Sequence, residues 1–160
     1  MISLAPDQSC PCGRRDAKGR ALRYAHCCAP WLESDAPAPD AHALMRSRYS
    51  AFVLERAPYL LHTWHASTRP QEIAFEPGVA WLGLEVRQFR PLDAEHAEVE
   101  FVARQRNPGA RAMRLHERSR FVREQGRWYY LDGQQFRGPP VTATALPACE
   151  TRRGTVRSSP

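Results

Sequence analysis

The middle of the chain carries two kinds of hydrophobic periodicity, and the first predicts helices. From residue 42 to residue 53, apolar side chains recur every three or four positions, as they do on a helix that buries one face. Asp40 is a suitable N-cap, so we predict a helix from there to about Arg56. Pro58 fits the first turn of a second, shorter helix with Leu60 on its apolar side. The inward residues of the first helix are Leu44, Met45, Tyr49, Phe52 and Val53.

After residue 70 the period changes to two, which is typical of strands. Apolar and polar positions alternate over three stretches, and a short aromatic run follows: residues 79–86, 96–106, 112–124 and 128–131. The first strand is expected to present Leu82, Leu84 and Val86 on one apolar face. Asn107-Pro108-Gly109 signals a turn, and Asp132-Gly133 is expected to close the last strand. Two helices followed by three or four antiparallel strands predict an α+β fold, a curved sheet wrapped against helices.

Composition divides the chain into four parts. Residues 1–33 hold a cysteine cluster, residues 34–41 read as a proline-stiffened linker, and residues 42–134 carry nearly all the large apolar side chains. Residues 135–160 are rich in Pro, Thr, Ser and Arg, so we predict a loosely ordered tail. The expected organisation is therefore a small N-terminal element joined to one core domain.

The charge of the chain says little about its partners. The formal net charge is +6, but 22 of the 23 basic residues are arginine, a bias more typical of genome composition than of a binding demand. No apolar run is long enough for a membrane span, and the first eight residues do not resemble a secretory signal. Five cysteines without such a signal indicate a reducing compartment, so we expect a cytoplasmic protein.

Four of the five cysteines lie within residues 10–28, in a pattern suited to zinc. Cys10 and Cys12 flank a single proline, and Pro11 with Gly13 favours the sharp turn that would bring both thiolates to one ion. Cys27-Cys28 would supply the other two ligands. Four thiolates fill a tetrahedral zinc site and leave no position for water or substrate, so we predict one structural Zn²⁺ ion.

The sequence leaves open which other residues contact this site. His26 is a fifth candidate ligand, although coordination is normally filled at four, which favours a solvated or neighbouring histidine. Unliganded thiols are the alternative for the cluster itself, but a segment with so few apolar residues would then have little to order it. Cys149 lies far along the tail, and we interpret it as a spectator.

Several motifs resemble a known family of bacterial proteins. Cys10-Pro-Cys12-Gly with Tyr24-Ala-His-Cys27-Cys28 is similar to the SEC-C motif, a small zinc element, although the loop from Arg14 to Ala21 looks expanded. The chain resembles YchJ-like proteins over roughly residues 8–134, in the segments Ala43–Phe52, Tyr59–His65, Ser67–Pro70, Trp81–Leu84, His116–Ser119 and Gly126–Gly133. The resemblance implies a nuclear-transport-factor-2-like cone for the core, assigns the four cysteines as ligands and brings no settled activity.

A cone of this type often encloses a pocket, so its inward polar residues are candidates for an active site. The candidate pocket residues are Tyr49, Trp64, His65, Glu117 and Trp128. Glu117 could act as an acid or base, but a buried ion pair, for instance with Arg48, is the favoured interpretation. His65 could be a general base, but a histidine at a helix end is commoner. The tryptophans are most simply core residues.

The sequence therefore favours a zinc-binding, non-enzymatic binding or adaptor protein. An acidic ligand or protein would meet the basic residues of the zinc loop: Arg14, Arg15, Lys18, Arg20 and Arg23. The first alternative is a small enzyme that uses the core pocket for acid-base chemistry. The second is nucleic-acid binding through the same basic loop.

Overall fold

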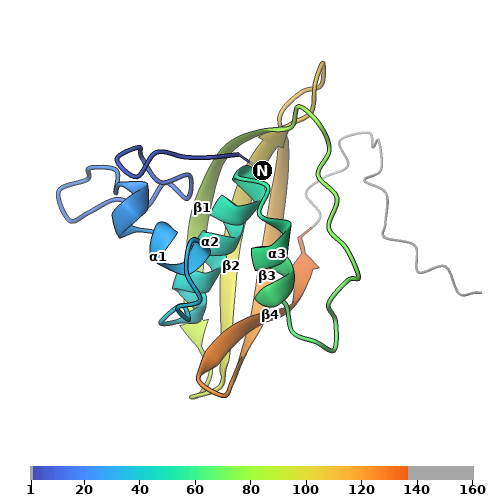
Figure 1. Cartoon of the computed structure of the whole chain (residues 1–160). Coiled ribbons are helices and arrows are strands. Elements are labelled where there is room, and N and C mark those ends of the chain that lie inside the picture. Colours follow the sequence, from blue (N-terminus) through green and yellow to red (C-terminus); the bar gives the residue numbers. More distant parts are fainter. Residues whose placement is uncertain (1, 137–160) are drawn as a thin grey trace, which may run out of the picture.

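The computed structural model describes residues 2–136, so most of the predicted tail, with Cys149, lies outside the described residues. Two short helical segments come first along the chain, two helices follow, and four strands come last (Figure 1). Their bounds are η1 Tyr24–His26, α1 Ala29–Leu32, α2 Ala41–Val53, α3 Ala57–His62, β1 Ala80–Pro91, β2 His96–Arg106, β3 Met113–Glu124 and β4 Arg127–Gln135. The longest described helix has 13 residues, and none of the described helices meets the requirements of a membrane span.

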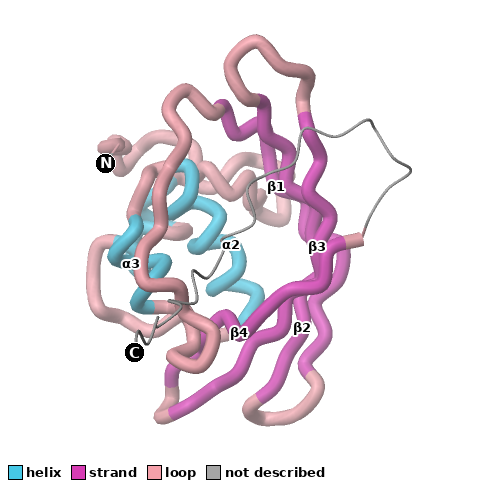
Figure 2. The backbone as a smooth tube through the Cα atoms, turned by 90° about the vertical axis from the view of Figure 1, so that its right-hand side faces the viewer, coloured by secondary structure: helices cyan, strands magenta, loops and turns pink. Residues whose placement is uncertain are grey.

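The four strands form one antiparallel sheet in the order β1-β2-β3-β4. Helices α2 and α3 cover one face of it, and the β3–β4 turn curls beneath them (Figure 2). The predicted helix starts are confirmed, because Asp40 accepts a hydrogen bond from the amide of Ala43 and Pro58 lies in the first turn of α3. The predicted α+β arrangement of helices against a curved sheet is thus the observed one.

The apolar face of the first strand differs from the prediction. A β-bulge between Trp81 and Gly83 inserts one residue, so the side chains before and after it change face. Trp81, Leu84 and Val86 therefore pack against the core, while Leu82 points outward with 45% of its surface exposed. Gly83 adopts φ +140°, a conformation open to glycine, and this permits the irregularity.

The last strand also continues past the predicted stop at Asp132-Gly133. Gly133 pairs with Ser119, and β4 runs on to Gln135. Asp132 is held in the strand because its carboxylate accepts a hydrogen bond from Arg120 Nε at 2.6 Å. Aspartate and glycine usually end a strand, but here the cross-strand ion pair and the packing behind Gly133 override that preference.

Because Gly133 has no side chain, the Glu117 side chain can occupy the space beside it. A β-carbon at Gly133 would overlap the Glu117 carboxylate and lie 2.8 Å from its Cγ, so the whole side chain would have to move. Gly133→Ala is expected to lower the free energy of unfolding by about 1–3 kcal/mol, as overpacking does elsewhere. Urea unfolding measures this. In a Glu117→Ala background the same change should cost little, and an equal cost in both backgrounds would contradict the assignment.

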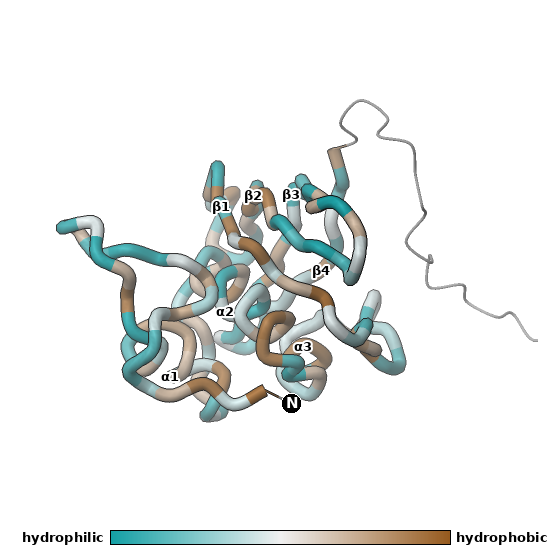
Figure 3. Tube along the Cα trace, turned by 90° about the horizontal axis from the view of Figure 1, so that it is seen from above, coloured by the Kyte–Doolittle hydropathy of each residue, from teal (hydrophilic) through white to brown (hydrophobic). Residues whose placement is uncertain are grey.

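The N-terminal element shares its core with the helices and the sheet. Cys10, Cys12 and Cys28 belong to the same buried cluster as Leu44 and Tyr49 of α2. Packing therefore continues across the predicted linker. The loop that projects from the N-terminal element is largely hydrophilic (Figure 3).

Candidate metal centre

The first two cysteines are brought together by a tight turn. The amide of Gly13 donates to the carbonyl of Cys10 at 3.0 Å, and Gly13 adopts φ +68°, which a residue with a side chain rarely does. The amide of Cys10 in turn donates to Leu22 at 2.8 Å. The turn predicted from Pro11 and Gly13 is confirmed, and it points Cys10 and Cys12 the same way.

The second pair lies at a junction of two short helical segments. Cys27 ends η1, with its amide donating to Tyr24 at 3.0 Å, and Cys28 begins α1, with its carbonyl accepting from Trp31 and Leu32 at 3.1 Å. The change of direction between the segments lets adjacent cysteines face one point.

The four sulfurs lie close enough together to share one metal ion. All four Sγ atoms lie within 4.8 Å of one another, with Cys12 and Cys27 at 3.5 Å and Cys27 and Cys28 at 4.0 Å. Sulfurs bound to one zinc ion at about 2.3 Å would be about 3.8 Å apart. The thiols are buried and free of disulfide bonds, so the cluster could hold a metal ion.

The electrostatics of the thiols favour a cation among them. Hydrogen bonds with Cys12, then with Cys27 and Cys28, lower the pKa of Cys10 far below its ordinary value. Hydrogen bonds with Cys10, Cys12 and Cys27 raise the pKa of Cys28 far above it. The thiolate of Cys10 is stabilised by the neighbouring thiols. The thiolate of Cys28 must form beside negative charge that is already present. A divalent cation removes that conflict.

Groups around the cluster fix it to the main helix. Arg46 donates from Nη1 to the carbonyl of Cys12 at 3.1 Å and from Nε to His42 at 2.9 Å. The Oγ of Ser50 lies 3.7 Å from the Sγ of Cys10. His26 is exposed and stands outside the group of four cysteines, so the solvated alternative for this histidine agrees with the structure.

The residues proposed for a core pocket do not meet at one point. Tyr49 packs edge-on against Trp81 at 5.4 Å, and His65 lies beyond α3 with its Nε2 3.1 Å from Glu124. Trp128 lines a small cavity at the β3–β4 hairpin, a cavity that the other four candidates do not line. These five residues therefore do not form one site at which they could carry out acid-base chemistry together.

Glu117 and Arg48 instead form part of a buried polar network. Glu117 accepts hydrogen bonds from Ser119 at 2.7 Å and from the hydroxyl of Tyr130 at 3.3 Å. The guanidinium of Arg48 lies 4.7 Å from the ring centre of Tyr130 and 5.1 Å from that of Trp64. Tyr130 thus stands between the two charges, and the expected direct pair is replaced by a pair mediated by this tyrosine.

Comparison with known proteins places the chain in a family. The model of the YchJ middle NTF2-like domain matches residues 40–133, which span α2 to β4. The chain belongs to the YchJ-like family. A UPF0225 protein of a Polaromonas strain is 67% identical over 133 residues, with 82% of this chain and 96% of that protein covered. A UPF0225 protein of Xanthomonas campestris is 50% identical over 136 residues, with 84% and 100% covered.

Two solved structures extend the similarity of this YchJ-like chain to the N-terminal element. A SEC-C motif containing protein from Rhodopseudomonas palustris has 31% identity and a TM-score of 0.67, covering 81% of this chain and all of that one. A second, from Psychrobacter arcticus, has 30% identity and a TM-score of 0.67, covering 89% and 86%. The predicted NTF2-like fold and the family resemblance are both confirmed.

The basic loop of the YchJ-like chain is an ordered hairpin. Asp16 accepts from the backbone amides of Lys18 at 2.8 Å and of Arg20 at 3.0 Å, and Arg20 also forms an ion pair with it at 2.8 Å. Arg15 donates to the carbonyl of Gly19 at 2.6 Å. Two of the five basic side chains thus support the hairpin itself. It projects to the left in Figure 1, away from the sheet, with all five side chains exposed.

Buried tyrosines make the YchJ-like fold sensitive to alkali. Burial raises the pKa of Tyr49 to about 12 and that of Tyr59 to about 12. The unfolded chain loses these protons near pH 10 and the folded chain retains them, so their contribution is complete below about pH 10 and lost as the pH approaches 12. We expect the free energy of unfolding to fall by about 1.4 kcal/mol per pH unit for each tyrosine in that window. Urea unfolding from about pH 9 to 12 tests this, and a flat profile would contradict it.

Proposed function

We propose that this chain is a non-enzymatic binding protein whose N-terminal element is ordered by one structural zinc ion. The observation that carries the proposal is the cluster of four buried sulfurs within 4.8 Å of one another. Cys10, Cys12, Cys27 and Cys28 would hold the ion, and four thiolates leave no coordination position for a substrate. When bound, zinc supplies the positive charge that keeps the four thiolates together. The reduced thiols that it requires fit a cytoplasmic setting.

Elemental analysis of the purified full chain tests the metal. We expect one zinc per chain, and a chelator that removes it should make the four thiols reactive. Cys149→Ser, which leaves the cluster intact, should bind the same amount. A natively purified chain that folds without zinc would overturn the proposal.

The hairpin of residues 14–23 is the surface we propose for an acidic protein partner. Arg14, Lys18 and Arg23 are exposed, and the metal element behind the hairpin holds it in one conformation. An ordered basic surface binds an acidic one with less loss of conformational freedom than a flexible loop would.

Affinity capture from a native lysate, with wild type beside Arg14→Ala/Lys18→Ala, tests this surface. We expect acidic proteins to be retained by wild type and lost from the double variant, and equal capture by both would contradict the proposal. Binding that instead requires nucleic acid and falls steeply with salt would favour the nucleic-acid alternative.

A further inference from the structure

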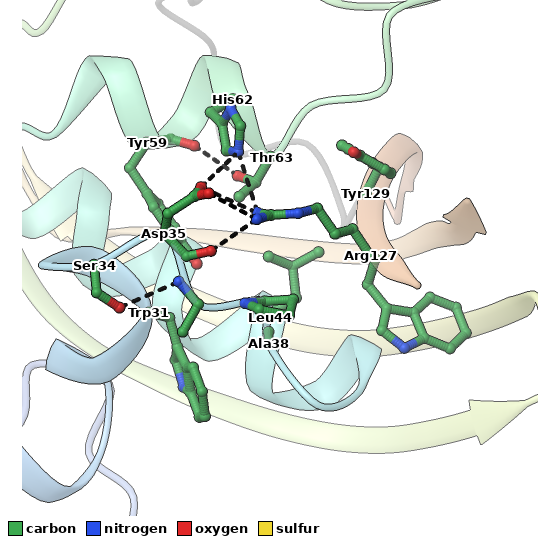
Figure 4. Close-up of a pocket in the computed structure, with 13 residues that line it drawn as sticks. Trp31, Ser34, Asp35, Ala38, Leu44, Tyr59, His62, Thr63, Arg127 and Tyr129 are labelled. Atoms are coloured by element: carbon green, nitrogen blue, oxygen red, sulfur yellow. Dashed lines mark hydrogen bonds and ion pairs between the residues drawn. The ribbon is translucent and has the colours of Figure 1, made fainter. Parts of the chain in front are cut away.

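A small cavity lies where the segment after α1 meets the β3–β4 hairpin (Figure 4). Its wall is aromatic and its polar groups converge on one carboxylate, an arrangement suited to a ligand. The residues that matter here are Trp31, Asp35, Tyr59, His62, Arg127 and Trp128. None of the four clustered cysteines lines this cavity.

The guanidinium of Arg127 holds the carboxylate of Asp35 through both of its terminal nitrogens. Nη1 lies 3.2 Å from Oδ1, and Nη2 lies 2.9 Å from Oδ2. His62 Nε2 lies 3.5 Å from the same Oδ1 and 3.4 Å from Arg127 Nη1. A forked guanidinium beside an imidazole is the arrangement by which proteins bind carboxylates from other molecules.

Arg127 also holds the backbone of Asp35, because Nη2 donates to its carbonyl oxygen at 2.8 Å. The Asp35 side chain is 80% exposed, and exposed ion pairs contribute little to stability. The segment is anchored before Asp35 by Glu33, which accepts from Tyr24 at 2.7 Å and Arg56 at 3.0 Å, and after it by buried Ala38. Residues 34–37 are exposed between these anchors, so the Asp35 side chain can rotate off Arg127 while its backbone carbonyl stays hydrogen-bonded to the guanidinium.

A ligand can enter this cavity only by replacing the Asp35 side chain, because little space remains beside it. With the carboxylate seated, the cavity measures about 30 Å³, which leaves room for water and not for a further group. We propose that this cavity binds a carboxylate-bearing ligand, whose acid group displaces Asp35 and pairs with Arg127 and His62 while its apolar part contacts Trp31, Tyr59 and Trp128. Asp35 then acts as an internal competitor that lowers the apparent affinity.

Titration of the full chain with phenylacetate, followed by tryptophan fluorescence, tests the proposal. We expect Asp35→Asn to bind at least about tenfold more tightly than wild type, because the competing charge is gone. Arg127→Gln in that background should abolish binding, and the neutral isostere phenylacetamide should not bind. Asp35→Ser provides a second variant at the same exposed position, and circular dichroism confirms that each variant is folded.

A second arm distinguishes the sources of the acid group. It uses an acetylated and amidated peptide with the sequence of residues 33–37. Tight binding of phenylacetate to Asp35→Asn indicates a free organic acid, and tight binding of the peptide indicates an acidic side chain of a protein. The proposal is overturned if neither probe binds more tightly to Asp35→Asn than to wild type. It is also overturned if phenylacetamide binds as well as phenylacetate, or if Arg127→Gln leaves binding unchanged.

Discussion

Cys12→Ser is expected to lose the metal and to unfold at a temperature lower by on the order of 10–20 °C. Cys12 has no exposed surface, and its backbone carbonyl accepts a hydrogen bond from Arg46 of α2. Metal binding adds its free energy to folding, and a loss of about 5 kcal/mol corresponds to this shift, since 1 kcal/mol is about 2–4 °C in a chain of this size. The core should weaken together with the N-terminal element, because both share one buried cluster.

Thermal unfolding followed by near-ultraviolet circular dichroism measures the effect, since the aromatic residues lie mainly in the core. Cys149→Ser is the matched control and should unfold like wild type. If Cys12→Ser lost its metal but kept the melting temperature of wild type, the cysteine cluster would not support the core.

Arg48→Ala should lower the free energy of unfolding by about 3–5 kcal/mol. Arg48 is almost wholly buried and donates from Nη1 to the carbonyl of Leu60 and to the hydroxyl of Thr63, both at 2.8 Å. Its guanidinium also contacts the rings of Trp64 and Tyr130. The substitution leaves a cavity, removes the Arg48 hydrogen bonds to Leu60 and Thr63, and leaves the carboxylate of Glu117 without this nearby cation.

Urea unfolding of three variants separates these contributions. Arg48→Met keeps most of the volume and should cost less than Arg48→Ala. Arg87→Ala removes a surface arginine whose Nε lies 3.5 Å from Glu85, and it should change the free energy of unfolding by less than about 1 kcal/mol. A cost for Arg48→Ala as small as that of Arg87→Ala would contradict the structural role given to Arg48.

Local patterns were sufficient to predict helices α2 and α3 and the strands of the sheet, but not η1 and α1. The period of two places Ala97, Val99 and Phe101 on the buried face of β2, and the structure buries all three. The N-cap at Asp40 and the turn at Cys10–Gly13 depend on side chains a few positions apart, so both could be predicted.

The sequence gives weaker signals for features that depend on distant partners. The bulge beside Gly83 is set by pairing with β2, so alternation along the strand predicts the wrong face for Leu82. Asp132 and Gly133 look like a strand end until Arg120 and Glu117 on the neighbouring strand are known. Asp35 and Arg127 are 92 positions apart, and no local pattern connects them.

The candidate site shows the same contrast. The cysteine spacing points to a metal cluster because all four ligands lie within 19 positions of one another. The candidate pocket residues come from four separate places in the sequence, since Trp64 and His65 are adjacent, and in the structure they do not share one set of neighbours. Alternation along the strand correctly predicts that Glu117 points inward. It cannot show that Tyr130 of the neighbouring strand lies between Glu117 and Arg48.

X-ray absorption at the zinc edge of the purified full chain tests the central claim most directly, because it reports the atoms that bind the metal. The arrangement of Cys10, Cys12, Cys27 and Cys28 predicts a single shell of four sulfurs at about 2.3 Å, with no nitrogen or oxygen neighbour. A nitrogen in the first shell would bring His26 or another histidine into the site. Such a nitrogen, an oxygen from water, or a chain without zinc would contradict the structural four-cysteine centre.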